Sequence, residues 1–528
     1  MIIGYLLKPG DDPGANRWVR FVAGLAVASL AVSLVLFAIR TISAISFAEP
    51  LFVITSGAEE ESTFAIWKYV HGLAVYADPY LPPFAASYYN WLFYAVYGTT
   101  TAFARHVFGL GDEWIPTIGR LPTLIFTGLG AIIAYYLFRP GFVAFGTNGQ
   151  ILAAALASFA FMGPLIGFWA ISVNPEIAAT VLGFTAISIF LAWYQRWPLT
   201  AVVAASILSY LSWSFKQSHV FVAGALMVFL FFRRDWRSLG FVVAIHGLTV
   251  GGTLAAGTDA YRLMIFYHIP LAKELFGAHA SGLNFEIATL TRNLINLAVK
   301  AGPLAAICIL PFILARMSPG GLRRAFNDDR LLLALCGFVI STILAIPASA
   351  KIGAAENYYF PLSIFTAFAL ATLWPHTAFY PQVSRAFFAI FAAGWIANAV
   401  ACATVLTGKA GVLSVRSWHA KFIAQRACIA ATPGPRLLIP IHLAVPWINP
   451  SGPYFVYAYN YPYDRAAGYQ YPEGTIHDLI ARAYFATLVV SEGSPAEFDG
   501  ASFERYTPAS TSCAGLSIYS RMDAKPTG

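Results

Sequence analysis

Charged side chains are scarce in this sequence. They make up 11% of its 528 residues, whereas soluble globular domains carry roughly 25%. Hydrophobic residues reach 58% and the mean hydropathy is +0.65. A water-soluble globule of this composition would expose too much apolar surface, and a disordered chain would contain far fewer apolar and aromatic residues. The composition therefore leaves a polytopic membrane protein.

Several functional signatures are also absent. The chain has no P-loop, no GxGxxG that opens a helix and no CxxC pair, so nothing in it indicates binding of a soluble nucleotide. Of its five cysteines, Cys428 and Cys513 lie in the polar C-terminal part and could pair if that part lies outside the cytoplasm. The net charge of +8 and pI near 9.1 indicate basic cytoplasmic loops rather than a nucleic-acid partner.

Long apolar runs predict the transmembrane architecture. A spanning helix needs about 20 mostly apolar residues, and eleven runs qualify. They are 18–39, 121–138, 150–171, 176–194, 198–214, 218–232, 238–256, 294–315, 331–349, 357–374 and 385–406. The first is not a cleavable signal peptide, because it is long and lacks a clear small-residue cleavage site.

Basic residues predict the orientation of these spans. With the N-terminus in the cytoplasm, the positive-inside rule is satisfied by the basic residues of the connecting segments. These residues are Arg139, Arg196, Arg233, Arg234, Arg237, Arg316, Arg323, Arg324, Arg330 and Arg385. The segments left on the outer face are 40–120, 172–176, the region around 216, 257–293, 350–357 and everything after 407.

Residues 88–108 could be read as one more span. That interpretation would place Arg139 and the cluster around Arg233 outside. We therefore predict helices lying at the outer membrane surface, with Tyr and Trp at the level of the headgroups.

The segment after 407 has a mixed, polar composition. RLLIPIHL and ATLVVS are typical of short buried strands, and TIHDLIARAYF of an amphipathic helix. The predicted fold is thus an all-α polytopic bundle over 1–407, whose first outer loop spans about 40–120 and carries interfacial helices. A small extracytoplasmic α/β domain follows over 408–528.

Polar residues collect in the predicted outer segments, and the first group is acidic. Glu59, Glu60 and Glu61 follow the first span directly. Neighbouring carboxylates repel one another, which raises the pKa of at least one and suits a general base. The alternative is a solvated helix N-terminus, where acidic residues are favoured by the helix dipole.

The other outer segments carry further candidate residues. Those for substrate contact are Asp78, Tyr89, Asn90, Glu176 and His268. Those for an anionic group are Lys216, Lys351, Asn357 and Tyr358. Taken singly, each has an ordinary explanation as an interfacial aromatic, a snorkelling lysine, a helix N-terminus or a capped turn. Their shared sidedness predicts a site at the outer interface that binds an anionic lipid and activates a hydroxyl.

These motifs resemble those of a known class of enzymes. The acidic pair after the first span and the pattern G…VY.DP…PF….YYNWLFY..YG over 72–98 are similar to the GT-C membrane glycosyltransferases. The similar branch is the Rhizobium lipopolysaccharide glycosyltransferase-like one, with protein mannosyltransferases and aminoarabinose transferases of lipid A as more distant relatives. The turn with Lys351, Gly353, Asn357 and Tyr358 also looks like a motif of that branch.

The resemblance implies a function. Such enzymes move a sugar from a polyprenyl-phosphate donor to a glycan, lipid or protein acceptor, here at the outer face of a bacterial inner membrane. Glu59 or Glu60 would be the general base of an inverting attack, and the two lysines would stabilise the leaving phosphate. Glu176 would orient the acceptor or help hold a divalent cation, which the resemblance leaves open; no other cofactor is implied.

Two other functions stay open at this point. A transporter or flippase would place ionisable residues at mid-bilayer, often on broken helices of an internal repeat, whereas these spans are nearly free of charge. An oligosaccharide ligase or polymerase would share the donor side but use a diphosphate-linked donor. The sequence names neither the sugar nor the acceptor.

Overall fold

The computed structural model describes most of the chain. The described residues are 13–46, 58–77, 81, 87–266, 286–310, 313, 316, 326–351, 354–377, 381–407, 412–432, 434–438, 473–491, 503–509 and 513–522.

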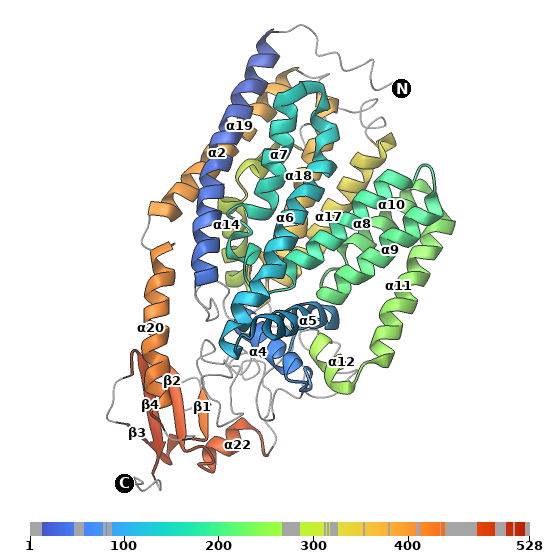
Figure 1. Cartoon of the computed structure of the whole chain (residues 1–528). Helices are drawn as coiled ribbons and strands as arrows, with labels where there is room; N and C mark the ends of the chain where they lie inside the picture. The colour runs from blue at the N-terminus through green and yellow to red at the C-terminus, as the bar shows by residue number, and fades with distance from the viewer. Residues whose placement is uncertain are drawn as a thin grey trace.

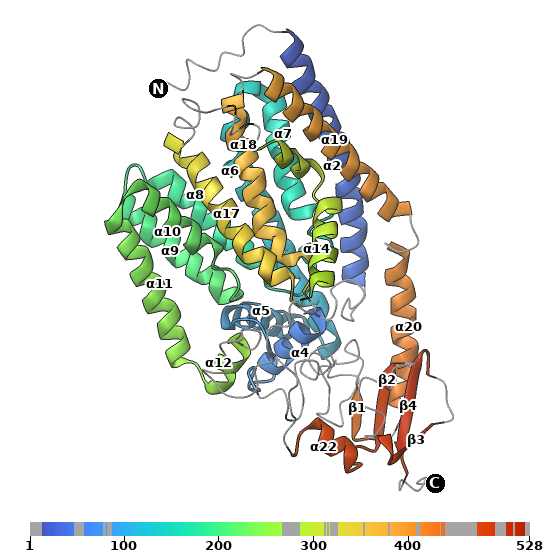
Figure 2. The same ribbon diagram turned by 180° about the vertical axis from the view of Figure 1, so that it is seen from behind.

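A bundle of long helices forms the body of the molecule (Figures 1 and 2). Each predicted span except 294–315 corresponds to one helix, although the helix at 150–171 ends at Met162, well before the end of that predicted span. These helices are α2 (Pro13–Ser46), α6 (Ile115–Phe142), α7 (Gly146–Met162), α8 (Glu176–Trp193), α9 (Pro198–Phe215), α10 (Phe221–Arg233), α11 (Trp236–Ala256), α17 (Asp329–Ser349), α18 (Phe360–Thr377) and α19 (Pro381–Thr407). The prediction of a polytopic helical bundle is confirmed.

The predicted number of spans needs correction. In the described part of the chain, seven stretches are long and apolar enough to cross a membrane, and one of them, Asp112–Met162, contains both α6 and α7. The segment 294–315 is not one helix. Instead α14 (Ile287–Lys300) ends and the 3₁₀ segment η4 (Gly302–Ile309) follows. Gly302 has a φ of +52°, and Pro303 has no amide hydrogen to continue the helical ladder, so the sequence breaks the helix there.

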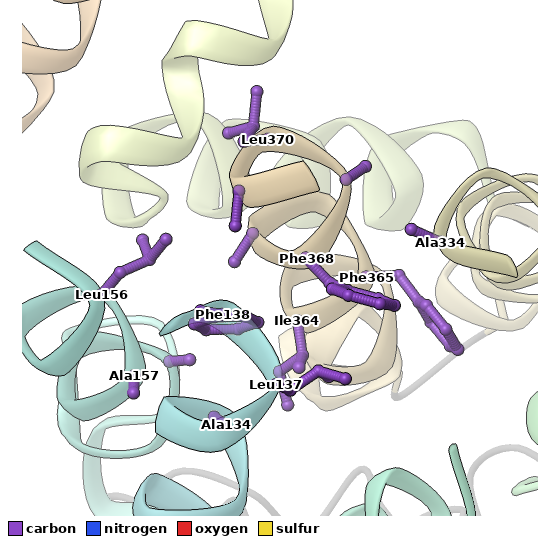
Figure 3. Packing of buried hydrophobic residues seen from close by; sticks show 14 of the residues in the cluster. Ala134, Leu137, Phe138, Leu156, Ala157, Ala334, Ile364, Phe365, Phe368 and Leu370 are labelled. Atoms are coloured by element: carbon purple, nitrogen blue, oxygen red, sulfur yellow. The ribbon is translucent and has the colours of Figure 1, made fainter. Parts of the chain in front are cut away.

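Large aromatic and small residues interlock in the core of the bundle. Figure 3 shows Phe138 of α6 and Phe365 and Phe368 of α18 meeting alanines of α6, α7 and α17. Glycines allow the closest approaches: a Cβ placed on Gly141 of α6 would lie 1.9 Å from the backbone oxygen of Ala371 in α18. The small residues therefore set the spacing of these helices.

This contact predicts an effect on stability. Gly141→Ala should destabilise the bundle by about 1–3 kcal/mol, because the new methyl meets backbone and not a movable side chain. Gly240→Ala in α11 is the matched control, since a Cβ there has nothing within 4 Å. Thermal unfolding in detergent should show a lower midpoint for the first variant only. Equal midpoints for the two variants would contradict the packing described here.

Shorter helices lie across one end of the bundle. They are α4 (Ala58–Val70), α5 (Trp91–Phe108) and α12 (Asp259–Phe266). Helix α2 begins at the opposite end of the bundle (Figure 1). Asn90 caps the start of α5, and Gly109 with a φ of 64° ends it. The 3₁₀ segments are η1 (Asp112–Trp114), η2 (Val143–Phe145), η3 (Gly167–Ala170) and η5 (Glu356–Tyr359). Of the segment 88–108, Trp91–Phe108 form a helix that lies across the end of the bundle and is not one of its long helices, whereas its place at the outer membrane surface stays a prediction.

The C-terminal part carries a small sheet beyond this end. The long helix α20 (Val412–Ala430) leads to strands β1 (Arg436–Leu438), β2 (Thr487–Ser491), β3 (Tyr506–Pro508) and β4 (Leu516–Arg521), with α22 (Ile476–Ala481) before β2. The sheet order is β1-β2-β4-β3, and only β1 and β2 are parallel. The predicted small α/β region is present, whereas the boundary at 407 stays a prediction.

Two connections hold this sheet in place. Cys428 of α20 and Cys513 are joined in a disulfide. Phe64 of α4 packs into the same apolar cluster as Phe422 of α20 and Val489 of β2. The C-terminal part therefore rests directly on the helix that begins with the three adjacent acids.

Candidate active site

Glu59 is fully engaged in a buried ion pair. The Nε and Nη2 atoms of Arg120 in α6 donate to its two carboxylate oxygens at 2.9 and 3.1 Å, and the amide of Val173 donates at 3.0 Å. Arg120 also donates to the carbonyl oxygen of Ala44 at the end of α2. Both side chains are fully buried. Glu59 thus ties α4, α6, α2 and the segment before α8 together.

Glu60 has the opposite environment. It is fully buried, and within the part of the chain that the structure describes neither of its carboxylate oxygens has a hydrogen-bond partner. Burial, and then the charge of Glu59, raise the pKa of Glu60 well above its usual value. A buried carboxyl group without partners is costly for stability and is typical of a functional site.

Glu61 and Lys68 organise the loop after α4. The amide of Tyr88 donates to Glu61 at 2.6 Å, and Lys68 donates to the carbonyl oxygen of Val75. Burial lowers the pKa of Lys68 to about 8, partly offset by the charge of Glu61. These contacts fold the start of the first loop back onto α4.

Glu176 is the centre of a second buried cluster. It begins α8, and its Oε1 accepts from Lys216 of the α9–α10 connection and from Asn357 of η5, the latter at 2.8 Å. Its Oε2 is buried and has no hydrogen-bond partner in the described ranges. Three segments far apart in the sequence therefore meet at one carboxylate.

Two lysines share the ring of Tyr358 in this cluster. The Nζ atom of Lys216 lies 5.4 Å from the ring centroid, and that of Lys351 lies 5.8 Å from it. Within the described residues, Lys351 has no carboxylate in ion-pair distance, and burial lowers its pKa to about 8. The cluster thus sets two ammonium groups against the single carboxylate of Glu176, which favours an anion beside Lys351.

Tyr89 and Asn90 lie at the edge of the same cluster. Lys216 Nζ is 5.7 Å from the ring centroid of Tyr89, and burial followed by the nearby acids raises the pKa of this phenol. The side chain of Asn90 is committed to structure, because it donates to Trp213 O at 2.9 Å and accepts from Tyr261 at 2.6 Å. Tyr89 therefore faces the cluster, whereas Asn90 fixes α5 to α9 and α12.

The two clusters are adjacent in the fold. Val173, which donates to Glu59, and Glu176 belong to the same short segment between η3 and the start of α8. Predicted site residues from the first loop, α8, α9–α10 and η5 are thus brought together. Asp78 and His268 lie outside the described residues. In the described part of the chain, no group of three or more His, Cys, Asp or Glu side chains is placed to hold a metal ion.

Sequence reasoning missed Arg120. Its signal was its position, because an arginine at the outer end of the predicted span 121–138 runs against the positive-inside rule. Such a buried cation requires an acidic partner. The sequence could therefore have indicated that Arg120 has an acidic partner, although it could not indicate which acid.

Comparison with solved structures shows what this arrangement is similar to. ArnT from Cupriavidus metallidurans bound to undecaprenyl phosphate aligns with a TM-score of 0.52 at 14% identity, over 95% of this chain and 98% of that chain. The same protein in the apo state aligns with a TM-score of 0.55 at 14% identity, over 94% and 97%. The apo oligosaccharyltransferase from Archaeoglobus fulgidus aligns with a TM-score of 0.50 at 13% identity, over 94% of this chain and 75% of that chain.

The chain has the GT-C fold. Its sequence matches no family model and no curated protein. The two neighbours are GT-C glycosyltransferases, and at these identities the likeness establishes the fold of a multi-pass membrane protein. The GT-C part of the sequence-based resemblance is confirmed at the level of fold, and the particular branch within the class stays a prediction.

Proposed function

We propose that this chain is a membrane glycosyltransferase that takes a sugar from a polyprenyl-phosphate donor and passes it to an acceptor hydroxyl. One observation carries the proposal: a buried cluster at the loop end of the GT-C bundle sets Lys216 and Lys351 against the single carboxylate of Glu176. A lipid phosphate is an anion that cannot leave the bilayer, so its site must lie where a spanning bundle meets the interface. The position of the cluster at the end of the bundle supports such a site.

Lys351 is the residue we assign to the donor phosphate. Lys216 already donates to Glu176, so its charge is partly satisfied, whereas Lys351 contacts only the ring of Tyr358 among the described charged and aromatic groups. A charge-assisted hydrogen bond from Lys351 to a phosphate oxygen would stabilise the negative charge that grows as the phosphate leaves. Asn357 and Tyr358 shape the same wall.

Glu60 is the residue we assign as general base. Glu59 accepts hydrogen bonds from Arg120 and Val173, whereas both carboxylate oxygens of Glu60 are without a hydrogen-bond partner among the described residues. In the reaction, the acceptor oxygen forms a bond to the anomeric carbon as the bond from that carbon to the phosphate oxygen breaks. The hydroxyl proton passes to Glu60, and polyprenyl phosphate leaves. Attack from the side opposite the phosphate inverts the anomeric centre.

The disulfide supports an extracytoplasmic site. Cys428 and Cys513 are paired, and disulfides persist mainly in oxidising compartments. We therefore propose that the end of the bundle with α4, α5 and the sheet faces the periplasm of a bacterial inner membrane. The acceptor would reach the site from that side.

Turnover by purified protein in nanodiscs tests the function. The protein is mixed with a panel of polyprenyl-phosphate and polyprenyl-diphosphate sugars and hydroxyl acceptors, and the released lipid is measured. Release of polyprenyl phosphate from a monophosphate donor supports the proposal. Release only from diphosphate donors would indicate a ligase, and vesicle assays that show lipid movement without bond cleavage would indicate a flippase.

Lys351→Met tests the donor site separately. We expect the affinity for undecaprenyl phosphate to fall by about tenfold or more, since a charge-assisted hydrogen bond is worth at least about 1.5 kcal/mol. Lys421→Met is the control, because Lys421 is an exposed lysine of α20 far along the chain. Binding is measured with the fluorescence of a labelled lipid in nanodiscs. Equal affinities for the two variants would remove Lys351 from the donor site.

A further inference from the structure

The turn that carries Lys351 is held from one side by a separate helix. This turn leads from the end of α17 at Ser349 to η5 at Glu356, and its described residues are 350–351 and 354–355. Helix α14 lies beside it, and its polar face points at the turn while Ile287, Ile295 and Val299 are exposed on the opposite face. The helix thus presents its hydrogen-bonding groups to the donor-site turn.

Asn293 makes the central contacts between α14 and the turn. Its Nδ2 atom donates to the carbonyl oxygen of Ser349 at 2.9 Å and to that of Ala354 at 3.1 Å. Asn293 is fully buried. One amide group therefore bridges the two ends of the turn and fixes their separation around Lys351.

Further contacts on α14 act on the same turn. The amide of Glu286 donates to Ala350 O at 2.8 Å, and Arg292 Nη2 donates to Ala354 O at 3.1 Å. Lys300 at the other end of α14 forms an ion pair with Glu356. The helix thus contacts the turn at its start, its middle and its end.

We propose that Asn293 is a positioning residue for the donor phosphate, acting by holding the Lys351 turn closed on the ring of Tyr358. This inference rests on the proposed function, because it assigns Lys351 to the phosphate. A lysine side chain that is free in solution loses rotamer entropy when it binds an anion. A turn closed by Asn293 has already placed the ammonium group, so the cost of binding is lower.

The pKa of Lys351 offers a readout that a merely structural role would not move. The groups around it are Tyr358, Lys216 with its partner Glu176, and on the α14 side Arg292 and the Lys300–Glu356 pair. Lys351 is half-buried in the turn, and desolvation there lowers its pKa to about 8. Opening the turn would hydrate the ammonium group and return its pKa toward about 10.4.

The experiment compares Asn293→Ala with wild type at pH 7 and pH 9. Undecaprenyl phosphate binding is measured in nanodiscs. The second pKa of a phosphate monoester is about 6, so the charge of the lipid is nearly the same at both pH values. Wild-type affinity should fall roughly tenfold from pH 7 to pH 9, because Lys351 loses most of its charge across a pKa of about 8. Asn293→Ala should bind about three- to tenfold more weakly at pH 7 and lose most of the pH dependence.

Controls separate this inference from the proposed function. Asn296→Ala changes the same helix at a side chain with no hydrogen bond to the described residues of the turn, and it should match wild type. If Asn293→Ala does not fold, Arg292→Ala removes one part-buried hydrogen bond to Ala354 and should flatten the pH dependence to a smaller degree. Wild-type affinity and pH dependence in Asn293→Ala, with binding lost in Lys351→Met, would overturn the role of Asn293 alone. Unchanged binding in Lys351→Met would overturn the donor site itself.

Discussion

Glu60→Gln is expected to lower turnover by about a hundredfold or more while leaving undecaprenyl phosphate binding unchanged. A positioned general base contributes roughly 10²–10⁴-fold, and glutamine keeps the shape of the side chain but cannot accept the hydroxyl proton. Because neither carboxylate oxygen of Glu60 has a hydrogen-bond partner among the described residues, the substitution should leave the fold intact. Glu113→Gln, at an exposed position of η1, is the matched control.

The pH profile of the wild type supplies a second test of Glu60. The base is active when deprotonated, and burial raises its pKa, so turnover should rise with pH through that raised pKa. Lys351 binds phosphate when protonated, so turnover should fall again as pH passes about 8. The residual activity of Glu60→Gln should lack the rising limb. Full activity in this variant would exclude Glu60, and Glu176, whose Oε2 is buried without a partner, would be the next candidate.

Arg120→Ala is expected to be the most destabilising substitution at this end of the bundle. It would leave the Glu59 carboxylate buried and uncompensated, and breaking a buried ion pair in this way costs about 3–5 kcal/mol. It also removes a donor to Ala44 O. Unfolding of the purified protein in detergent, followed by intrinsic fluorescence against a denaturant, should show the loss. Arg105→Ala breaks the more exposed pair with Asp112 and should cost less than about 1 kcal/mol.

Glu59→Gln distinguishes the role of Glu59 from the role proposed for Glu60. It should destabilise the protein as Arg120→Ala does, because the arginine is then buried without a counter-charge. In a double-mutant cycle, the combined variant should be less destabilised than the sum of the single variants, since both charges are gone. Additive losses would show that the two side chains do not depend on each other. A loss of turnover without a loss of stability would place Glu59 in the reaction itself.

The positions of most bundle helices could be predicted from the sequence alone. So could the gathering of the polar candidate residues at one end of the bundle. A chain that crosses lipid must satisfy its backbone hydrogen bonds within each segment, so apolar runs such as 176–194 and 331–349 become helices almost residue for residue. The positive-inside rule kept residues 88–108 from being counted as a span, and most of this segment is the helix α5 across the end of the bundle. It failed at 294–315, where hydropathy continues but Gly302 and Pro303 end the helix.

The partners of the charged side chains followed only from the three-dimensional packing. The packing pairs Glu59 and not Glu60 with an arginine, and Lys216 and not Lys351 with a carboxylate. Successive residues of a helix point about 100° apart, so Glu59, Glu60 and Glu61 face different surroundings, and Arg120, 61 residues away, donates to Glu59. Likewise Lys216 and Asn357 both donate to Glu176, whereas Lys351 lies against the ring of Tyr358. Long-range packing sets these pairings, so the sequence around a residue does not indicate a partner that lies so far along the chain.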